Sequence, residues 1–172
     1  MIHTTELQSY FISVEENNQY KNEALNCSID EIKDALQNNI GDEGALGLSF
    51  ALANCSKLLS FGLYLPANKI GANGASGIGS ILANFTNLKY LEINLSVNEI
   101  GDEGASGLGS GLAKCTNLSN LTLDFTSCKI GKNGALGLSS GLANCTHLSN
   151  LLLLIQQKQL ISFGLQYFQM PK

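Results

Sequence analysis

Hydrophobic and polar positions repeat along this chain with a period of 30 residues from residue 40 onward. The dipeptide Ile-Gly marks the same point of each repeat, at 40/41, 70/71, 100/101 and 130/131. A fixed period of this length is typical of proteins whose units stack on one another and so bury a continuous core. The pattern therefore predicts an array of about four stacked units within residues 40–172.

The first half of each repeat has the pattern of a helix. In the first copy, Ala45, Leu48, Leu52 and Ala53 are spaced to form one apolar stripe on a helix. The same spacing returns in residues 74–83, 104–113 and 134–143. Acidic residues at 42, 43, 102 and 103 fall at the predicted helix starts, where the positive end of the helix dipole favours anions.

Each predicted helix carries a glycine in its interior, at position 47, 77, 107 or 137. An interior glycine costs about 1 kcal/mol relative to alanine. A cost that recurs in every repeat needs a structural reason. We expect neighbouring helices, or helix and sheet, to approach each other too closely for a Cβ atom.

The second half of each repeat has the pattern of a β-strand. Leu91, Ile93 and Leu95 alternate with other residues at a period of two, and so do Leu121, Leu123 and Phe125. A strand followed by a helix in every repeat requires right-handed crossovers and a parallel sheet. We therefore predict an α/β solenoid with its strands on the inner face.

The combined pattern resembles a known repeat family. The run Leu91-x-Ile93-x-Leu95-x-x-Asn98-x-Ile100 resembles a leucine-rich repeat, and the helical half that follows it is similar to the ribonuclease-inhibitor-like subfamily. The resemblance implies a right-handed solenoid with a curved parallel sheet on the concave face and helices outside. It covers about residues 40–170.

The resemblance also implies a structural role for one residue of each repeat. The asparagine ladder of the family corresponds to Asn68 and Asn98, with Cys128 at the third position, and Asn38 is in register with them. These side chains are expected to be buried and to bond the backbone of the strand-to-helix turn. Lys158 breaks the pattern at the fourth position.

The two ends of the chain depart from the repeat. Residues 1–39 do not follow the period, and we predict that they form an N-terminal capping segment with a short helix near residues 28–37. Ser28 and Glu31 have the spacing of a capping box at its start. Beyond Lys158, the alignment of Leu160, Gly164 and Phe168 with the repeat predicts a diverged C-terminal helix. That helix is either a cap or the end of an array cut short.

Side chains on the concave face vary between repeats, whereas the core positions do not. Variation on a fixed scaffold is typical of a binding surface. We predict that this surface contacts a protein partner through residues of the four strands. They are Tyr64, Tyr90, Glu92, Asn94, Asn120, Thr122, Asp124, Leu152 and Leu154.

Three groups among these residues allow two interpretations each. Tyr64 and Tyr90 are expected roughly 5 Å apart across adjacent strands, either as partner anchors or as an aromatic pair that steadies the sheet. Glu92 and Asp124 form an acidic patch for a basic partner, or they are simply solvated charges. Leu152 and Leu154 of the last strand are covered by the C-terminal tail or by a partner, or that strand is a buried edge.

The sequence indicates a protein-binding scaffold without catalysis. No Cys-x-x-Cys motif is present, and neither His3 nor His147 has neighbours in the sequence that would activate it. We expect no cofactor and no metal. The resemblance leaves two alternatives: an activator of a small GTPase, and a piece of a larger repeat protein without a function of its own.

Composition and charge limit the classes of partner that the chain is expected to bind. The net charge is −4 and all ten basic residues are lysines, which argues against a nucleic-acid partner. The longest apolar run, residues 151–155, is too short to span a bilayer, and the N-terminus shows no signal peptide. Three of the five cysteines share a repeat position with Phe85, which indicates buried thiols. These features favour a cytoplasmic protein without membrane contact. The apolar last strand also makes self-association through the C-terminal edge possible.

Overall fold

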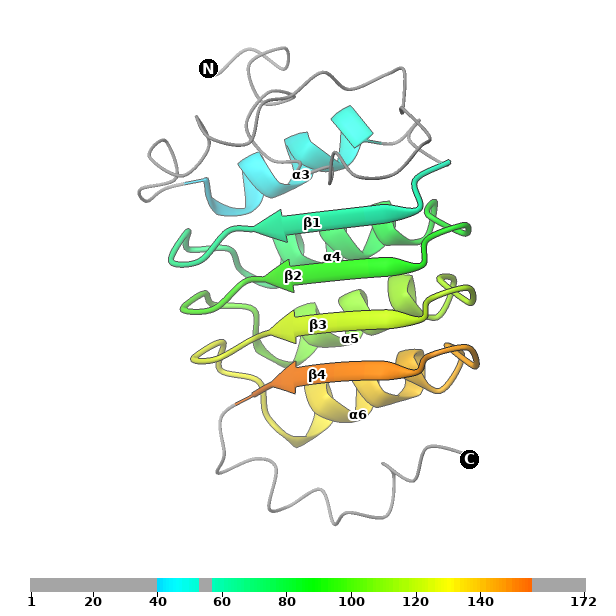
Figure 1. Ribbon diagram of the computed structural model, residues 1–172. Helices are drawn as coiled ribbons and strands as arrows, with labels where there is room; N and C mark the ends of the chain where they lie inside the picture. The colour runs from blue at the N-terminus through cyan, green and yellow to red at the C-terminus, as the bar shows by residue number, and fades with distance from the viewer. Residues whose placement is uncertain (1–39, 53–56, 156–172) are drawn as a thin grey trace.

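The computed structural model of the chain describes residues 40–52 and 57–155, in which helices and strands alternate (Figure 1). The predicted N-terminal cap and diverged C-terminal helix lie outside these residues, as do Asn38 and Lys158. The elements in chain order are α3 (Gly41–Leu52), β1 (Ser60–Tyr64), α4 (Ala72–Leu82), β2 (Tyr90–Asn94), α5 (Gly101–Leu112), β3 (Asn120–Asp124), α6 (Lys132–Leu142) and β4 (Asn150–Leu154).

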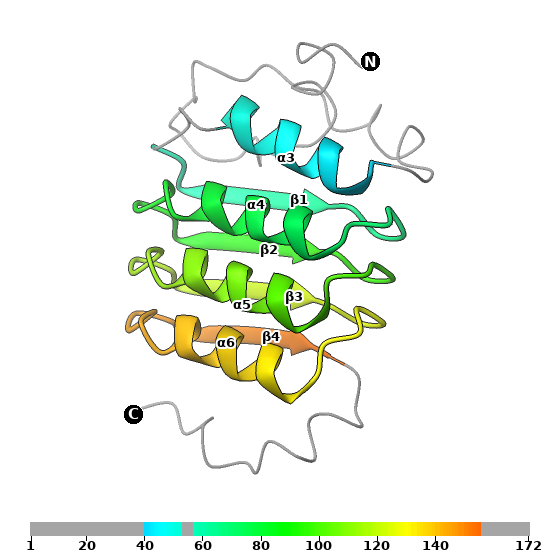
Figure 2. The same ribbon diagram turned by 180° about the vertical axis from the view of Figure 1, so that it is seen from behind.

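The strands form one parallel sheet in the order β1-β2-β3-β4. Each strand residue pairs with the residue 30 positions later, as Leu91 does with Leu121. The helices lie together on one side of the sheet, as the view from behind shows (Figure 2). This α/β architecture, with four parallel strands in one sheet alternating with helices, confirms the predicted fold class and is consistent with a leucine-rich-repeat solenoid.

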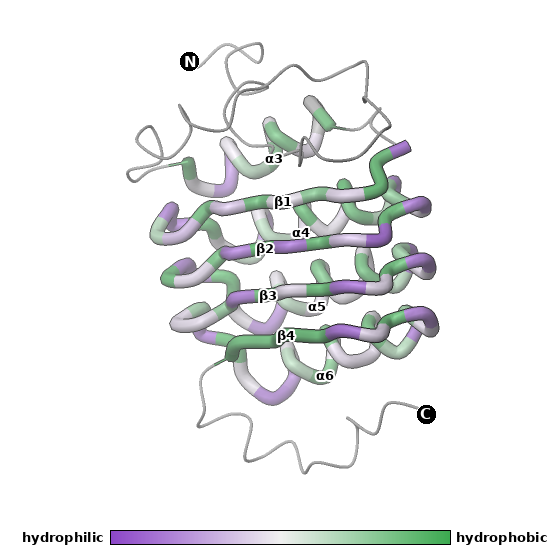
Figure 3. Tube along the Cα trace, in the orientation of Figure 1, coloured by the Kyte–Doolittle hydropathy of each residue, from purple (hydrophilic) through white to green (hydrophobic). Residues whose placement is uncertain are grey.

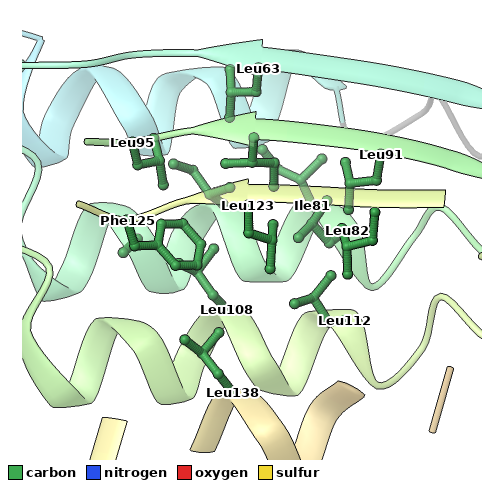
Figure 4. Packing of buried hydrophobic residues seen from close by; sticks show 14 of the residues in the cluster. Leu63, Ile81, Leu82, Leu91, Leu95, Leu108, Leu112, Leu123, Phe125 and Leu138 are labelled. Atoms are coloured by element: carbon green, nitrogen blue, oxygen red, sulfur yellow. The ribbon is translucent and has the colours of Figure 1, made fainter. Parts of the chain in front are cut away.

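The core lies between the sheet and the helices (Figure 4). Alternate strand residues point into it, so that Leu63, Ile93 and Leu123 are fully buried. Leu108 and Leu112 of α5 meet them from the helix side. The period-two pattern and the helical stripe thus supply the two halves of one apolar layer.

The ladder asparagine in the turn after β2 is buried and fully bonded, as expected. Oδ1 of Asn98 accepts hydrogen bonds from the backbone N–H groups of Asn68 (3.0 Å) and Ile70 (2.9 Å). Its Nδ2 donates to the carbonyl oxygens of Leu65 and Leu95, both at 2.8 Å. In the next repeat the thiol of Cys128 donates to the Leu95 carbonyl at 2.9 Å. The side chain therefore satisfies backbone groups that no strand or helix reaches.

The interior glycines allow the helices to touch through their backbones. A Cβ atom on Gly111 would lie 2.6 Å from the carbonyl carbon of Gly79, and one on Gly141 would lie 2.6 Å from that of Gly109. A Cβ on Gly107 would lie 2.9 Å from the Cα atom of Ser76. Among the predicted positions, the expectation of close approach is confirmed at Gly107 and at Gly137, where a Cβ would lie 2.7 Å from the Cα atom of Ser106, and the contact is between helices. At Gly77 a Cβ would instead meet the end of the Leu46 side chain at 2.7 Å.

The helix entries alternate between two forms, so the array has a period of two repeats as well as one. Asp42 and Asp102 lie at the starts of alternate helices, and each carboxylate accepts a hydrogen bond from the N–H group at the start of the following helix. The donor–acceptor distances are 2.6 Å from Gly71 and 2.5 Å from Gly131. The aspartates therefore cap the helix of the next repeat rather than their own.

The backbone follows the same alternation. The helices that carry these aspartates have a left-handed glycine at their entry, Gly41 (φ 58°) and Gly101 (φ 62°). The other two helices have an extended glycine there, and the left-handed residue is a lysine two positions earlier, Lys69 (φ 55°) or Lys129 (φ 57°). Glycine adopts a left-handed conformation at little cost, whereas a lysine must be held there by its surroundings.

The described array is less well covered at β4 than in its middle. Leu151 and Leu153 occupy core positions but are only partly buried, whereas Leu121 and Leu123 of the preceding strand are buried. The β4 trace is also hydrophobic along most of its length (Figure 3). Both faces of this last strand are therefore apolar, as the sequence predicts.

Candidate protein-binding face

The side of the sheet away from the helices presents the variable side chains, and it corresponds to the predicted concave face. We call it the open sheet face. Along each strand the residues that alternate with the core positions belong to it. In β2 the core positions are buried, and in β4 exposed residues alternate with half-buried ones. Its residues are Ser60, Gly62, Tyr64, Tyr90, Glu92, Asn94, Asn120, Thr122, Asp124, Asn150, Leu152 and Leu154.

The strict register arranges these residues in three rows across the four strands. The row at the start of the strands runs Ser60–Tyr90–Asn120–Asn150. The middle row runs Gly62–Glu92–Thr122–Leu152, and the last row runs Tyr64–Asn94–Asp124–Leu154. All nine predicted contact residues therefore share one face.

The expected closeness of Tyr64 and Tyr90 is wrong. Tyr64 pairs with Asn94, and Tyr90 pairs with Ser60, so the two tyrosines lie at opposite ends of adjacent strands. Four residues along a strand separate their rows by roughly 13 Å. The register follows the repeat, and only residues 30 apart become partners. A cross-strand aromatic pair is thereby excluded, and the two side chains stand apart with 40% and 48% of their surface exposed.

The two carboxylates lie on the two middle strands of the open sheet face, Glu92 in the middle row and Asp124 in the last row. Glu92 lies between Gly62 and Thr122, and Asp124 is its diagonal neighbour on the next strand. A strand spacing of about 4.8 Å and a rise of about 3.3 Å per residue place diagonal neighbours of a parallel sheet roughly 8 Å apart. Oδ1 of Asp124 also accepts a hydrogen bond from the N–H group of Thr126 at 2.9 Å, which fixes the side chain at the strand end. The two acids are therefore close enough to act on one bound cationic side chain.

The leucines of β4 lie beside the carboxylates. Leu152 pairs with Thr122 and Leu154 pairs with Asp124. They are 52% and 41% exposed, so the alternative of a buried edge strand is wrong. An exposed pair of leucines next to a pair of acids gives this half of the face both apolar and charged contact area.

The asparagines on the face are partly used within the protein. Nδ2 of Asn150 donates to Oδ1 of Asn120 at 2.6 Å, which links β4 to β3 at the strand starts. Oδ1 of Asn94 accepts hydrogen bonds from the N–H and hydroxyl groups of Ser96, at 3.0 and 2.8 Å. These amides therefore stabilise the sheet and its turn, and only their remaining groups are available to a partner.

The cysteine thiols in the described residues are structural. Burial raises the pKa of Cys115 to about 12 and that of Cys128 to about 11, and it also raises the pKa of Cys145. The thiols of Cys115 and Cys145 donate to the carbonyl oxygens of Leu82 (3.2 Å) and Leu112 (3.5 Å). A buried neutral thiol is a poor nucleophile, so these three cysteines are not reactive centres.

Metal ligands are not clustered in residues 40–52 and 57–155, where no group of three His, Cys, Asp or Glu side chains could hold an ion. Nδ1 of His147 lies 3.1 Å from the carbonyl oxygen of Thr116 in the neighbouring repeat. Within the same residues, no helix has the length and apolar character needed to cross a membrane.

One exposed apolar residue does not follow from the sequence pattern. Val97 lies in the turn after β2 with a left-handed φ of 59°, and it is exposed. A β-branched residue rarely adopts this conformation. The helical and strand periods describe only helix and strand positions. They therefore do not predict the conformation or the exposure of a turn residue such as Val97.

Comparison with known protein families agrees with this architecture. The family model described as leucine-rich repeat matches residues 37–49, 86–109 and 117–139. The second and third matches each run from before a strand into the helix that follows it. These matches support a leucine-rich repeat protein. No curated protein matches the chain.

Proposed function

We propose that this chain is a protein-binding scaffold that uses the open sheet face as its contact surface. Leucine-rich repeats generally mediate protein–protein interaction, which supports the proposal. The observation that carries it is the distribution of exposed apolar side chains. Of the seven large hydrophobic residues that are exposed in the described chain, four lie on this face: Tyr64, Tyr90, Leu152 and Leu154. Aromatic and apolar side chains of this kind anchor protein interfaces.

A capture experiment with matched variants tests the proposal. The full chain is immobilised, and binding partners are compared between the wild type and the double variant Tyr90→Ala/Leu152→Ala. The control is Leu46→Ala/Leu136→Ala, which removes two exposed leucines from helices. We expect capture to be lost in the first variant and retained in the second, with unchanged circular dichroism in both. Capture that survives the first variant and is lost in the second would place the contact surface on the helices.

The finer family assignment is also a proposal. The described repeats each contain one strand of five residues and one helix of 11 or 12 residues. A full helix in every repeat supports the ribonuclease-inhibitor-like subfamily. A cytoplasmic location likewise stays a prediction from the sequence.

The GTPase activator and the piece of a larger repeat protein remain alternatives from the resemblance. No contact or charge arrangement among the described residues favours either of them over a scaffold. A panel of small GTPases assayed with and without the chain tests the first, and we expect no stimulation of hydrolysis.

Self-association through the C-terminal edge has one observation in its favour. Within the described sheet β4 pairs only with β3, and its leucines are exposed on the open sheet face. Strand edges of this kind invite pairing with another chain. Sedimentation of the full chain over a range of concentrations tests it, with Leu152→Lys expected to reduce any association.

A further inference from the structure

We infer that the open sheet face binds an extended, basic segment of its partner, with a lysine or arginine over the carboxylates of Glu92 and Asp124 and apolar residues on either side of it. This inference rests on the proposed function and names the chemistry of the partner. It follows from the order of side chains across the strands, from their charge and from their exposure.

The order across the strands is aromatic, acidic, aliphatic. Tyr64 lies on β1, Glu92 and Tyr90 on β2, Asp124 on β3, and the exposed leucines on β4. A segment that crosses the strands therefore meets an aromatic ring first, carboxylates next and leucine side chains last. The last row, Tyr64–Asn94–Asp124–Leu154, contains all three kinds of side chain in one line.

The charge of the face has a single sign. Among its twelve residues the charged ones are Glu92 and Asp124, and no lysine belongs to it. The lysines in the described chain lie outside the strands. Lys57 and Lys89 precede β1 and β2, Lys69 follows β1, and Lys129 follows β3 with its Nζ 3.3 Å from Oε1 of Glu99. A basic segment is thus attracted to the middle of the face, and an acidic one is repelled from it.

The dimensions fix the spacing of the partner residues. Neighbouring strands lie roughly 4.8 Å apart, so β1 to β4 spans roughly 14 Å, which an extended peptide covers in about four residues. Side chains on one side of an extended peptide recur at every second residue. The matching segment therefore has an apolar residue, a basic residue two positions later and an aliphatic residue two positions after that.

The two kinds of contact have different consequences. The exposed leucines and tyrosines supply apolar area, whereas the carboxylates of the exposed Glu92 and the half-buried Asp124 supply orientation and rate of association. Binding should therefore depend on ionic strength, because interactions between exposed charges are screened by salt.

Selection of peptides on the intact chain tests the inference. A phage-displayed library of random peptides is selected against the full chain, and the recovered peptides are synthesised. Their affinity is measured for the wild type and for the double variant Glu92→Gln/Asp124→Asn, in which each carboxylate becomes an amide. The side-chain oxygen at position 124 can then still accept the hydrogen bond of the Thr126 N–H group. The matched control is Glu103→Gln, which neutralises an exposed acid at the start of α5.

Three outcomes are distinguishable. We expect the selected peptides to carry lysine or arginine between apolar residues, and their affinity to fall about tenfold (~1.4 kcal/mol) in the double variant and to stay unchanged in the control. The inference would be overturned if the selected peptides are not basic and bind the double variant as tightly as the wild type. If Tyr90→Ala still abolishes their binding, the proposed function stands. Peptides whose binding is unaffected by any change on the open sheet face would contradict the proposed function itself.

Discussion

The side-chain oxygen of Asn98 lies 3.0 Å from the backbone nitrogen of Asn68, the residue at the same position of the preceding repeat. One ladder asparagine thus holds the turn that carries the other. The same amide also bonds Ile70, Leu65 and Leu95, so it joins the end of one strand to the start of the helix in the neighbouring repeat. These hydrogen bonds of the Asn98 side chain hold adjacent repeats in the fixed register on which the open sheet face depends.

Replacing Asn98 should lower the stability of the fold substantially. We predict that Asn98→Leu lowers the free energy of unfolding by about 3 kcal/mol or more, because several buried backbone groups lose their partners at once. Urea denaturation of the full chain measures the effect. The matched control is Asn94→Ala, at a half-buried residue whose side-chain oxygen bonds Ser96, and it should cost less than about 1 kcal/mol. Equal stability of the wild type and Asn98→Leu would refute the structural role of the ladder.

The glycine contacts between helices predict a reversal of the usual helix preference. Glycine to alanine in a helix interior normally stabilises by about 1 kcal/mol. We expect Gly111→Ala to destabilise by about 1–3 kcal/mol instead, because its Cβ would lie 2.6 Å from the Gly79 carbonyl carbon. Ser110→Ala, at the exposed neighbouring position, should be neutral or slightly stabilising. Thermal denaturation of both variants measures these changes in stability. A stabilised Gly111→Ala would show that the helices do not pack through their backbones.

The alternation of helix entries predicts that two adjacent acids differ in importance. Asp102 accepts the hydrogen bond of the Gly131 N–H group, whereas Glu103 is exposed. We expect Asp102→Ala to cost about 0.5–2 kcal/mol, as the loss of a helix cap does, and Glu103→Ala to cost less than about 0.5 kcal/mol. Chemical denaturation of the two single variants measures the difference. Equal costs would mean that the acids act only through the dipole of their own helix.

The buried thiols predict a loss of stability at alkaline pH. In the unfolded chain a cysteine ionises near pH 9, whereas burial raises the pKa of Cys115 to about 12 in the folded chain. Above pH 9 the unfolded state therefore loses its proton first, and stability falls as the pH rises toward 12. The slope is at most about 1.4 kcal/mol per pH unit for each thiol.

Urea midpoints at about pH 8 and about pH 10 measure this dependence, because the two values lie on either side of the ionisation of an unfolded cysteine. The variant Cys115→Ala should lose less stability between the two pH values than the wild type, because it lacks one of the buried thiols. A wild type and a variant that lose the same amount would show that the thiol of Cys115 does not contribute to the pH dependence.

The period of the sequence predicts most of this fold, because each repeat contributes the same residue types to the same layer. Ile93 and Leu123 are buried where the strand pattern places them, and Asn98 is bonded where the resemblance implies. Agreement among four copies removes the ambiguity that a single short strand leaves.

The separation of Tyr90 from Tyr64 does not follow from the pattern within one strand, because it depends on the register between strands. The cross-repeat bond from Gly71 to Asp42 also escapes prediction. The sequence places each acid at the dipole of its own helix, and a contact with the next helix depends on the stacking distance, which no single repeat encodes. The site residues vary from repeat to repeat, so periodicity locates their face without identifying the partner.

Hydroxyl-radical footprinting of the chain, free and bound to a captured partner, tests most directly whether the open sheet face is the contact surface. The chain offers matched probes, since Leu152 and Leu154 are exposed on the open sheet face while Leu46 and Leu136 are exposed on helices. We predict that the partner protects Leu152, Leu154 and Tyr90 from oxidation and leaves Leu46 and Leu136 unchanged. Protection of the helix leucines, with the open sheet face still oxidised at its free rate, would contradict the proposal.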